Sequence, residues 1–317
     1  MKKIVVLGGG TGLSVLLRGL KQFPLDITAI VTVADDGSSS GRLREEFDIF
    51  AVGDLRNVLV SLSEVEPLIE DLLQYRFVTD SSLNNHPMGN LLLTALYNIT
   101  GNLTESLRSL SKIFNIKGTI LPFTEENPVL IAHTTDGKII EGESNITKAG
   151  KEIDYIEYKN EVKPTKEVIK AIDEADLIIF GIGSLYTSII PNLLSKEVVE
   201  SLKNSKAKKM YVCNIMSEHG ETDNYKVSDC IKKINSYVKK DLMDVVVVNN
   251  KKVPDDIKER YLGETAGQID IDYDVLNDMN IEIIEDELLY ISEKKKVRHD
   301  PYRTALAIFN YIVKELK

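Results

Sequence analysis

The chain has 317 residues, enough for one large α/β domain or for two smaller domains. It carries 39 Lys and Arg against 49 Asp and Glu, and the net charge of −10 argues against a nucleic-acid-binding surface. Its apolar runs have the length of strands, far below the ~20 residues of a membrane span. Because there are two cysteines and no secretory leader pattern, we expect a cytoplasmic protein without a disulfide framework.

Short apolar runs along the chain predict the buried strands of a mainly parallel sheet. They are Ile4–Leu7, Ile27–Val33, Leu177–Phe180, Met210–Cys213 and Val245–Val248. Amphipathic stretches of helical spacing separate most of them, which is typical of right-handed βαβ crossovers. Between about residues 118 and 158 the pattern changes to short alternating runs joined by Asp136-Gly137, a hairpin signal. We expect one α/β domain over residues 1–317, with a small antiparallel insertion at about 118–158.

The first loop with a chemical signal follows the first predicted strand and reads Gly8-Gly9-Gly10-Thr11-Gly12. Glycines here let the backbone turn sharply and approach a diphosphate, and the amides that begin the next helix favour an anion. Leu13 occupies the place of the third glycine of the G-x-G-x-x-G pattern, which disfavours a nicotinamide oxidoreductase. A tight turn without a ligand is the alternative interpretation.

Carboxylates form the second signal. Asp35 and Asp36 follow the second predicted strand, and Asp54 precedes a later apolar helix pattern. Such residues can accept hydrogen bonds from ribose hydroxyls or hold Mg²⁺ beside a phosphate, so all three are candidate catalytic residues, and Asp35 and Asp54 are candidate metal ligands. The alternative role for these aspartates is to cap the helices that follow them. The segment 37–41, Gly-Ser-Ser-Ser-Gly, matches the nucleophile elbow of hydrolases, but the two carboxylates before it argue against that chemistry.

A dense polar loop, Asn84–Asn90, precedes the predicted helix Leu91–Tyr97. His86 within this loop is a candidate acid, base or phosphate ligand near neutral pH. A capping or loop role is the alternative for this histidine.

The second half of the chain repeats the pattern of a strand that ends in a polar loop. Leu177–Phe180 leads into residues 181–188, whose glycines and hydroxyl groups suit a second phosphate or sugar site. Met210–Cys213 leads into the polar segment 214–222. Because parallel strands end at one edge of a sheet, we expect these loops to hold two ends of one ligand. Near the C-terminus, Arg298 precedes the last predicted helix and can face an anion or solvent.

In combination, these motifs resemble those of the bacterial gluconeogenesis factors. The segments that carry the resemblance are GGGTGLSVLLRGL, TVADDGSSSGRLR, GDLRNVLVSLS, GNLLLTAL, GIGSLYTSIIPNLL, CNIMSEHGET and RHDP. Those factors form one branch of the CofD-like family, whose other branch comprises the 2-phospho-L-lactate transferases. The resemblance implies a Rossmann-like three-layer sandwich, a nucleotide ligand with UDP-sugars such as UDP-N-acetylglucosamine favoured, and self-association. It also implies a role in growth and cell shape on gluconeogenic carbon sources.

The resemblance can be carried over residue by residue. Tyr261 and Arg298 match the nucleotide-contacting Tyr and Arg of the gluconeogenesis branch. In the transferases, acidic residues of the region after the second strand serve the metal and the transferred phosphate, and that role could fall here on Asp35, Asp36 or Asp54. The sequence departs from the usual family pattern at Ser38, Asn85–Met88 and Ile182. The full set of candidate binding residues is Gly9, Gly10, Thr11, Gly12, Asp36, Asn90, Gly183, Ser184, Leu185, Asn214, Tyr261 and Arg298.

Two functional hypotheses follow from these residues. The first is a regulator that binds a nucleotide-sugar without obligatory turnover. The second is a Mg²⁺-dependent transferase that moves a phospholactate-like group from a nucleotide diphosphate to an acceptor hydroxyl.

Overall fold

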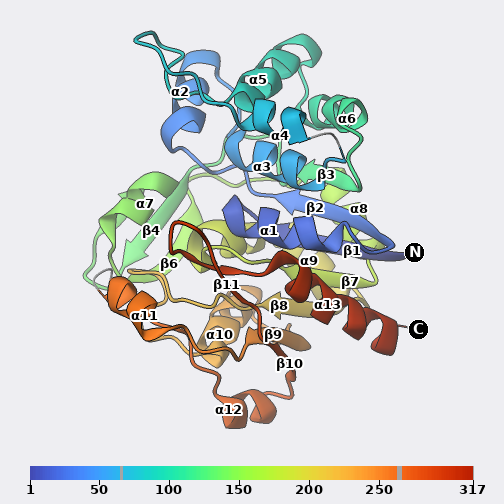
Figure 1. The fold of residues 1–317 in the computed structure, drawn as a ribbon, viewed down its shortest axis with the longest axis vertical. Coiled ribbons are helices and arrows are strands. Elements are labelled where there is room, and N and C mark those ends of the chain that lie inside the picture. The colour runs from blue at the N-terminus through green and yellow to red at the C-terminus, as the bar shows by residue number, and fades with distance from the viewer. Residues whose placement is uncertain (65–66, 263–265, 317) are drawn as a thin grey trace.

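The computed structural model describes residues 1–64, 67–262 and 266–316. Within them, seven parallel strands form a central sheet in the order β10-β9-β8-β7-β1-β2-β3 (Figure 1). The bounds are β1 Lys2–Gly8, β2 Leu25–Val31, β3 Thr119–Pro122, β7 Leu177–Phe180, β8 Lys208–Val212, β9 Val245–Asn249 and β10 Glu282–Asp286. The strands predicted from apolar runs all lie in this sheet, because runs such as Val245–Val248 are buried on both faces.

Helices cover both faces of the sheet and enclose two separate apolar cores. On one face lie α1 Gly10–Leu20, α2 Ser38–Phe47, α3 Gly53–Leu62, α5 Met88–Thr100, α6 Leu103–Ile113 and α13 Pro301–Glu315. On the other lie α8 Lys166–Glu174, η1 Leu185–Ile189, η2 Ile190–Leu193, α9 Lys196–Asn204, α10 Val227–Val238 and α12 Tyr273–Asp278. This arrangement confirms the α/β, Rossmann-like three-layer sandwich. None of the helices in the described ranges is both long and apolar enough to cross a membrane.

Smaller elements extend the sandwich at the edge where the strands end. An antiparallel sheet joins β4 Leu130–Thr134 to β5 Ile139–Glu141 and β6 Ile153–Tyr158, with α7 Glu143–Ala149 beside it (Figure 1). The hairpin predicted at Asp136-Gly137 connects β4 to β5. Since β3 belongs to the parallel sheet, the antiparallel part begins at Leu130 rather than near residue 118. The remaining elements are α4 Pro67–Gln74, α11 Asp255–Leu262 and the hairpin of β11 Leu289–Ile291 with β12 Val297–His299.

The contact between α1 and α13 depends on Gly19. A Cβ at Gly19 would overlap the carbonyl oxygen of Pro301 and lie 2.8 Å from the Cβ of Ala305. Gly19→Ala is therefore expected to lower the free energy of unfolding by about 1–3 kcal/mol, because the two helices must move apart. Denaturant unfolding followed by circular dichroism measures this change.

Gly267→Ala is the matched control for that change, since a Cβ there would meet no atom within 4 Å. Its free energy of unfolding should stay within about 0.5 kcal/mol of the wild type. If Gly19→Ala and Gly267→Ala unfold at the same denaturant concentration, the close contact between α1 and α13 is not needed for stability.

Candidate functional site

The glycine loop connects β1 to α1 at the carboxyl edge of the sheet. Gly10 has a φ of +67°, a conformation that favours glycine, and its amide donates a 2.7 Å hydrogen bond to Oδ2 of Asp54. A Cβ at Gly9 would lie 2.5 Å from Oγ1 of Thr32 and 2.9 Å from Oδ2 of Asp54. The glycines thus allow the start of α1 to sit directly against the second strand and the start of α3.

A cavity of about 290 Å³ opens in front of this loop. Its walls come from the start of α1, the loops after β7 and β8, α11 and β12. Eight of the predicted binding residues line it: Gly10, Thr11, Gly12, Gly183, Ser184, Asn214, Tyr261 and Arg298. Sequence segments far apart in the chain therefore meet at one hollow. A larger hollow of about 500 Å³, at the starts of α6 and α8, includes none of the predicted site residues.

Asn214 holds the two loops of the second half together. Its Nδ2 donates a 2.8 Å hydrogen bond to the carbonyl of Gly183, and its Oδ1 accepts one of 3.3 Å from the amide of Gly183. This reciprocal pair fixes the loop after β7 against the loop after β8. The backbone of these two loops, which lines the cavity beside the start of α1, is thereby set in place.

Tyr261 and Arg298 are the predicted residues that the C-terminal part of the chain contributes to the cavity lining. The hydroxyl of Tyr261 accepts a 2.9 Å hydrogen bond from the amide of Val297, and Nη1 of Arg298 donates one of 2.8 Å to the carbonyl of Val297. Burial raises the pKa of the neighbouring Glu218, and the positive charge of Arg298 opposes that rise. The guanidinium therefore supplies a positive charge to a cavity that also contains an acidic side chain.

An acidic cluster lies beside the glycine loop. Burial and the nearby charge of Asp35 raise the pKa of Asp54 to about 7. Burial, together with the charges of Asp35, Asp54 and Asp36, raises the pKa of Glu143 to about 7. Glu143 begins α7, in the antiparallel insertion, and was not among the predicted residues. The insertion thus brings a fourth carboxyl group to the cluster.

Asp36 has a structural partner in the same insertion. Its Oδ1 accepts a 2.8 Å hydrogen bond from the amide of Ser144 in the first turn of α7. Gly142 has a φ of +94°, and a Cβ there would overlap Oδ2 of Asp36. Asp36 therefore anchors α7 to the loop after β2 and does not line the cavity.

Asn90 and His86 join α5 to α2 away from the cavity lining. Nδ1 of His86 lies 2.8 Å from Oγ of Ser39, which also accepts a 3.0 Å hydrogen bond from Nδ2 of Asn90. All three side chains are buried, and burial lowers the pKa of His86. Ser39 is thus occupied within α2, an arrangement unlike the exposed serine of a nucleophile elbow.

Glu221 is a second buried acid that the sequence patterns did not reveal. It accepts hydrogen bonds from Oγ of Ser184 and, at 3.2 Å, from the amide of Tyr186. Burial and the adjacent Glu218 raise its pKa well above the ordinary value of 4.5. Leu185, a predicted binding residue, points into the apolar core, so only its backbone could serve a ligand.

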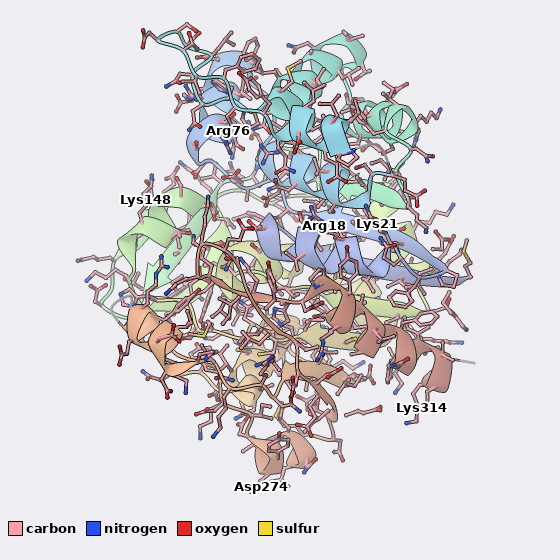
Figure 2. All side chains as sticks on the ribbon, in the orientation of Figure 1. Arg18, Lys21, Arg76, Lys148, Asp274 and Lys314 are labelled. Carbon is pink, nitrogen blue, oxygen red and sulfur yellow. The ribbon has the colours of Figure 1, made fainter. Side chains whose placement is uncertain are left out.

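A second hollow of about 300 Å³ adjoins the cavity along α1. The two hollows share Thr11, Val15, Arg298 and His299. Arg18 is an exposed residue of α1 (Figure 2). It lines only the second hollow. Arg298 and His299 of β12 therefore line both the cavity and the second hollow.

Comparisons with known proteins agree with this architecture. The model of the family described as "2-phospho-L-lactate transferase CofD" matches residues 4–289. The gluconeogenesis factor of Bacillus subtilis is 47% identical over 304 residues, covering 96% of each chain. That of Halalkalibacterium halodurans is 45% identical over 308 residues, covering 97% of this chain and 95% of the relative. A crystal structure of a Bacillus halodurans protein superposes with a TM-score of 0.93 at 45% identity, covering 97% of this chain and 99% of the other.

Proposed function

Because the chain belongs to the CofD family, we propose that the cavity in front of the glycine loop binds a nucleotide, with a UDP-sugar such as UDP-N-acetylglucosamine as the ligand. The observation that carries this proposal is the meeting of the amides that begin α1 with Arg298 and Tyr261 at one cavity. We further propose that the protein acts in the cytoplasm as a homo-oligomeric factor for growth and cell shape on gluconeogenic carbon sources. The similarity to the two gluconeogenesis factors supports the gluconeogenic part.

The diphosphate would lie at the start of α1. The free amides of a helix N-terminus and its dipole attract an anion, and Thr11 and Gly12 in the first turn of α1 line the cavity. Arg298, which β12 contributes to the same cavity, would add a charge-assisted hydrogen bond. The raised pKa values of Asp54 and Glu143 reduce the negative charge of the acidic cluster at neutral pH. A dianionic group therefore meets less repulsion than the count of carboxyl groups suggests.

A Mg²⁺-dependent transferase is the second candidate function, and the closeness of Asp35 to Asp54 favours it. Mg²⁺ binds through one or two carboxylates and completes its shell with water and phosphate oxygens, so this pair fits the ion. When bound there, the ion would neutralise charge on the transferred phosphate. Within the described ranges, no three His, Cys, Asp or Glu side chains gather as metal ligands. The donor set thus suits a Mg²⁺ shared with substrate.

Calorimetry with UDP-N-acetylglucosamine, with and without Mg²⁺, separates the two candidates. We expect binding without Mg²⁺ and no product after prolonged incubation. The regulator proposal fails if UDP-sugars do not bind while a guanosine-linked phospholactate is consumed with a deazaflavin acceptor.

Arg298→Ala is expected to weaken nucleotide binding by about 1.5–3 kcal/mol, roughly 10- to 150-fold in affinity, because a charge-assisted hydrogen bond is lost. The dissociation constant from calorimetry measures the effect. Arg303→Ala is the control, since Arg303 lies on α13 near Glu287 and lines neither hollow. An unchanged dissociation constant for Arg298→Ala removes this residue from the site.

A further inference from the structure

The second hollow, beside α1, carries an excess of positive charge. Arg18 and Arg298 line it, and within the part of the chain that the structure describes its lining includes no Asp or Glu. The whole chain has a net charge of −10, so the hollow differs in sign from the rest of the molecule. A concave surface with charge of one sign raises the local concentration of counter-ions, which here are anions.

The fold does not neutralise the two guanidinium groups of this hollow. Among the described residues, neither Arg18 nor Arg298 forms an ion pair with a carboxylate. Arg298 donates from Nη1 to the carbonyl of Val297, which uses one of the five N–H groups of a guanidinium. Both arginines are exposed, so a ligand that enters from solvent can reach them.

Asn57 of α3 adds a hydrogen-bond donor to the lining of the second hollow. Its Oδ1 accepts a 2.6 Å hydrogen bond from Nη2 of Arg56. Because a guanidinium can only donate, this contact fixes which atom of the Asn57 amide is the oxygen, and the remaining Nδ2 can only donate. A carboxylate or phosphate group, whose oxygens carry lone pairs, matches such a set of donors and positive charges.

The second hollow is large enough for a small molecule and lies next to the cavity. Its volume of about 300 Å³ is at the lower end of the range of ligand pockets. Arg298 lines both spaces, whereas Arg18 lines the second hollow alone. A change at Arg18 therefore separates events in the second hollow from binding in the cavity.

We propose that the second hollow is an anion-binding subsite, in which Arg18 and Arg298 hold the carboxylate or phosphate group of a small organic molecule. A guanidinium suits this task because its planar fork can donate to two oxygens of one such group. Two sources supply the anion: a separate molecule, or an acidic sugar on a nucleotide in the cavity. The first source needs no nucleotide, so the subsite can be tested apart from the proposed function.

Calorimetry with 3-phosphoglycerate at constant ionic strength tests the first source, because this molecule carries both a carboxylate and a phosphate. We expect it to bind to the wild type and to bind about tenfold more weakly or worse to Arg18→Ala, which loses a charge-assisted contact. Glycerol, the uncharged counterpart, should not bind. Arg303→Ala removes an exposed arginine that lines neither hollow, and it should keep the wild-type affinity.

UDP-glucuronate and UDP-glucose test the second source, since the former has a carboxylate where the latter has a hydroxymethyl group. A preference of about tenfold for UDP-glucuronate that Arg18→Ala abolishes assigns the anion to the nucleotide. The affinity of Arg18→Ala for UDP-N-acetylglucosamine should stay within about twofold of the wild type, because Arg18 does not line the cavity.

The outcomes separate the subsite from the proposed function. If neither 3-phosphoglycerate nor UDP-glucuronate binds in a way that depends on Arg18, the subsite is overturned, even where UDP-N-acetylglucosamine binds. If UDP-N-acetylglucosamine fails to bind while 3-phosphoglycerate binds through Arg18, the proposed function is overturned and the subsite stands.

Discussion

Replacing Gly12 with alanine is expected to weaken nucleotide binding by about 2 kcal/mol, roughly 30-fold in affinity. A Cβ at this position would overlap the carbonyl oxygen of Ile182 and lie 2.9 Å from its Cγ2. The start of α1 and the loop after β7 must then separate. Since both segments line the cavity, their separation shifts the amides of α1 relative to Arg298. Calorimetry with a UDP-sugar measures the loss.

Gly8→Ala, at the end of β1, is the matched control. A Cβ there would lie 3.7 Å from the Cβ of Leu13, an ordinary contact distance, so we expect the wild-type affinity. Thermal melting of both variants shows whether they fold. If Gly12→Ala folds and binds as tightly as Gly8→Ala, the close approach of α1 to the loop after β7 does not shape the site.

Stability should depend on pH through Glu221. This buried carboxyl group has a folded-state pKa above its unfolded value of about 4.5, so the folded protein binds the proton more tightly. The free energy of unfolding therefore falls as the pH rises from about 5 toward 8, by about 1.4 kcal/mol per pH unit for a single such group. Glu221→Gln mimics the protonated acid and should be about 2–4 kcal/mol more stable than the wild type near pH 8.

Urea unfolding at several pH values measures that difference. At about pH 5 the wild type and Glu221→Gln should unfold alike, because both are then neutral at this position. Glu161→Gln, at an exposed position, is the control and should follow the wild type at every pH. A Glu221→Gln variant that is less stable than the wild type at pH 8 shows that the charged acid is the favoured form.

The sheet and the main loops could be predicted because their signals are local. Runs such as Val245–Val248 are long enough for a strand and too apolar for an exposed segment. The loops that follow parallel strands must meet at the carboxyl edge of the sheet. The glycine-rich sequence likewise predicted the sharp turn at Gly10, where φ is +67°. These inferences need only the neighbours of a residue in the sequence.

Other features depend on contacts between distant segments, which local patterns do not encode. Glu143 reaches the acidic cluster because the antiparallel insertion docks through the hydrogen bond between Asp36 and Ser144. Glu221 is buried only because the loop after β8 folds over Ser184. Asn90 was a candidate binding residue, but its amide group pairs with Ser39 across two helices. Each of these roles is decided by tertiary packing.

A crystal structure of the protein with UDP-N-acetylglucosamine tests the central claim most directly. We predict diphosphate oxygens within hydrogen-bonding distance of the amides of Thr11 and Gly12 and of the guanidinium of Arg298. A nucleotide bound elsewhere, with its phosphates away from the start of α1, would contradict the account.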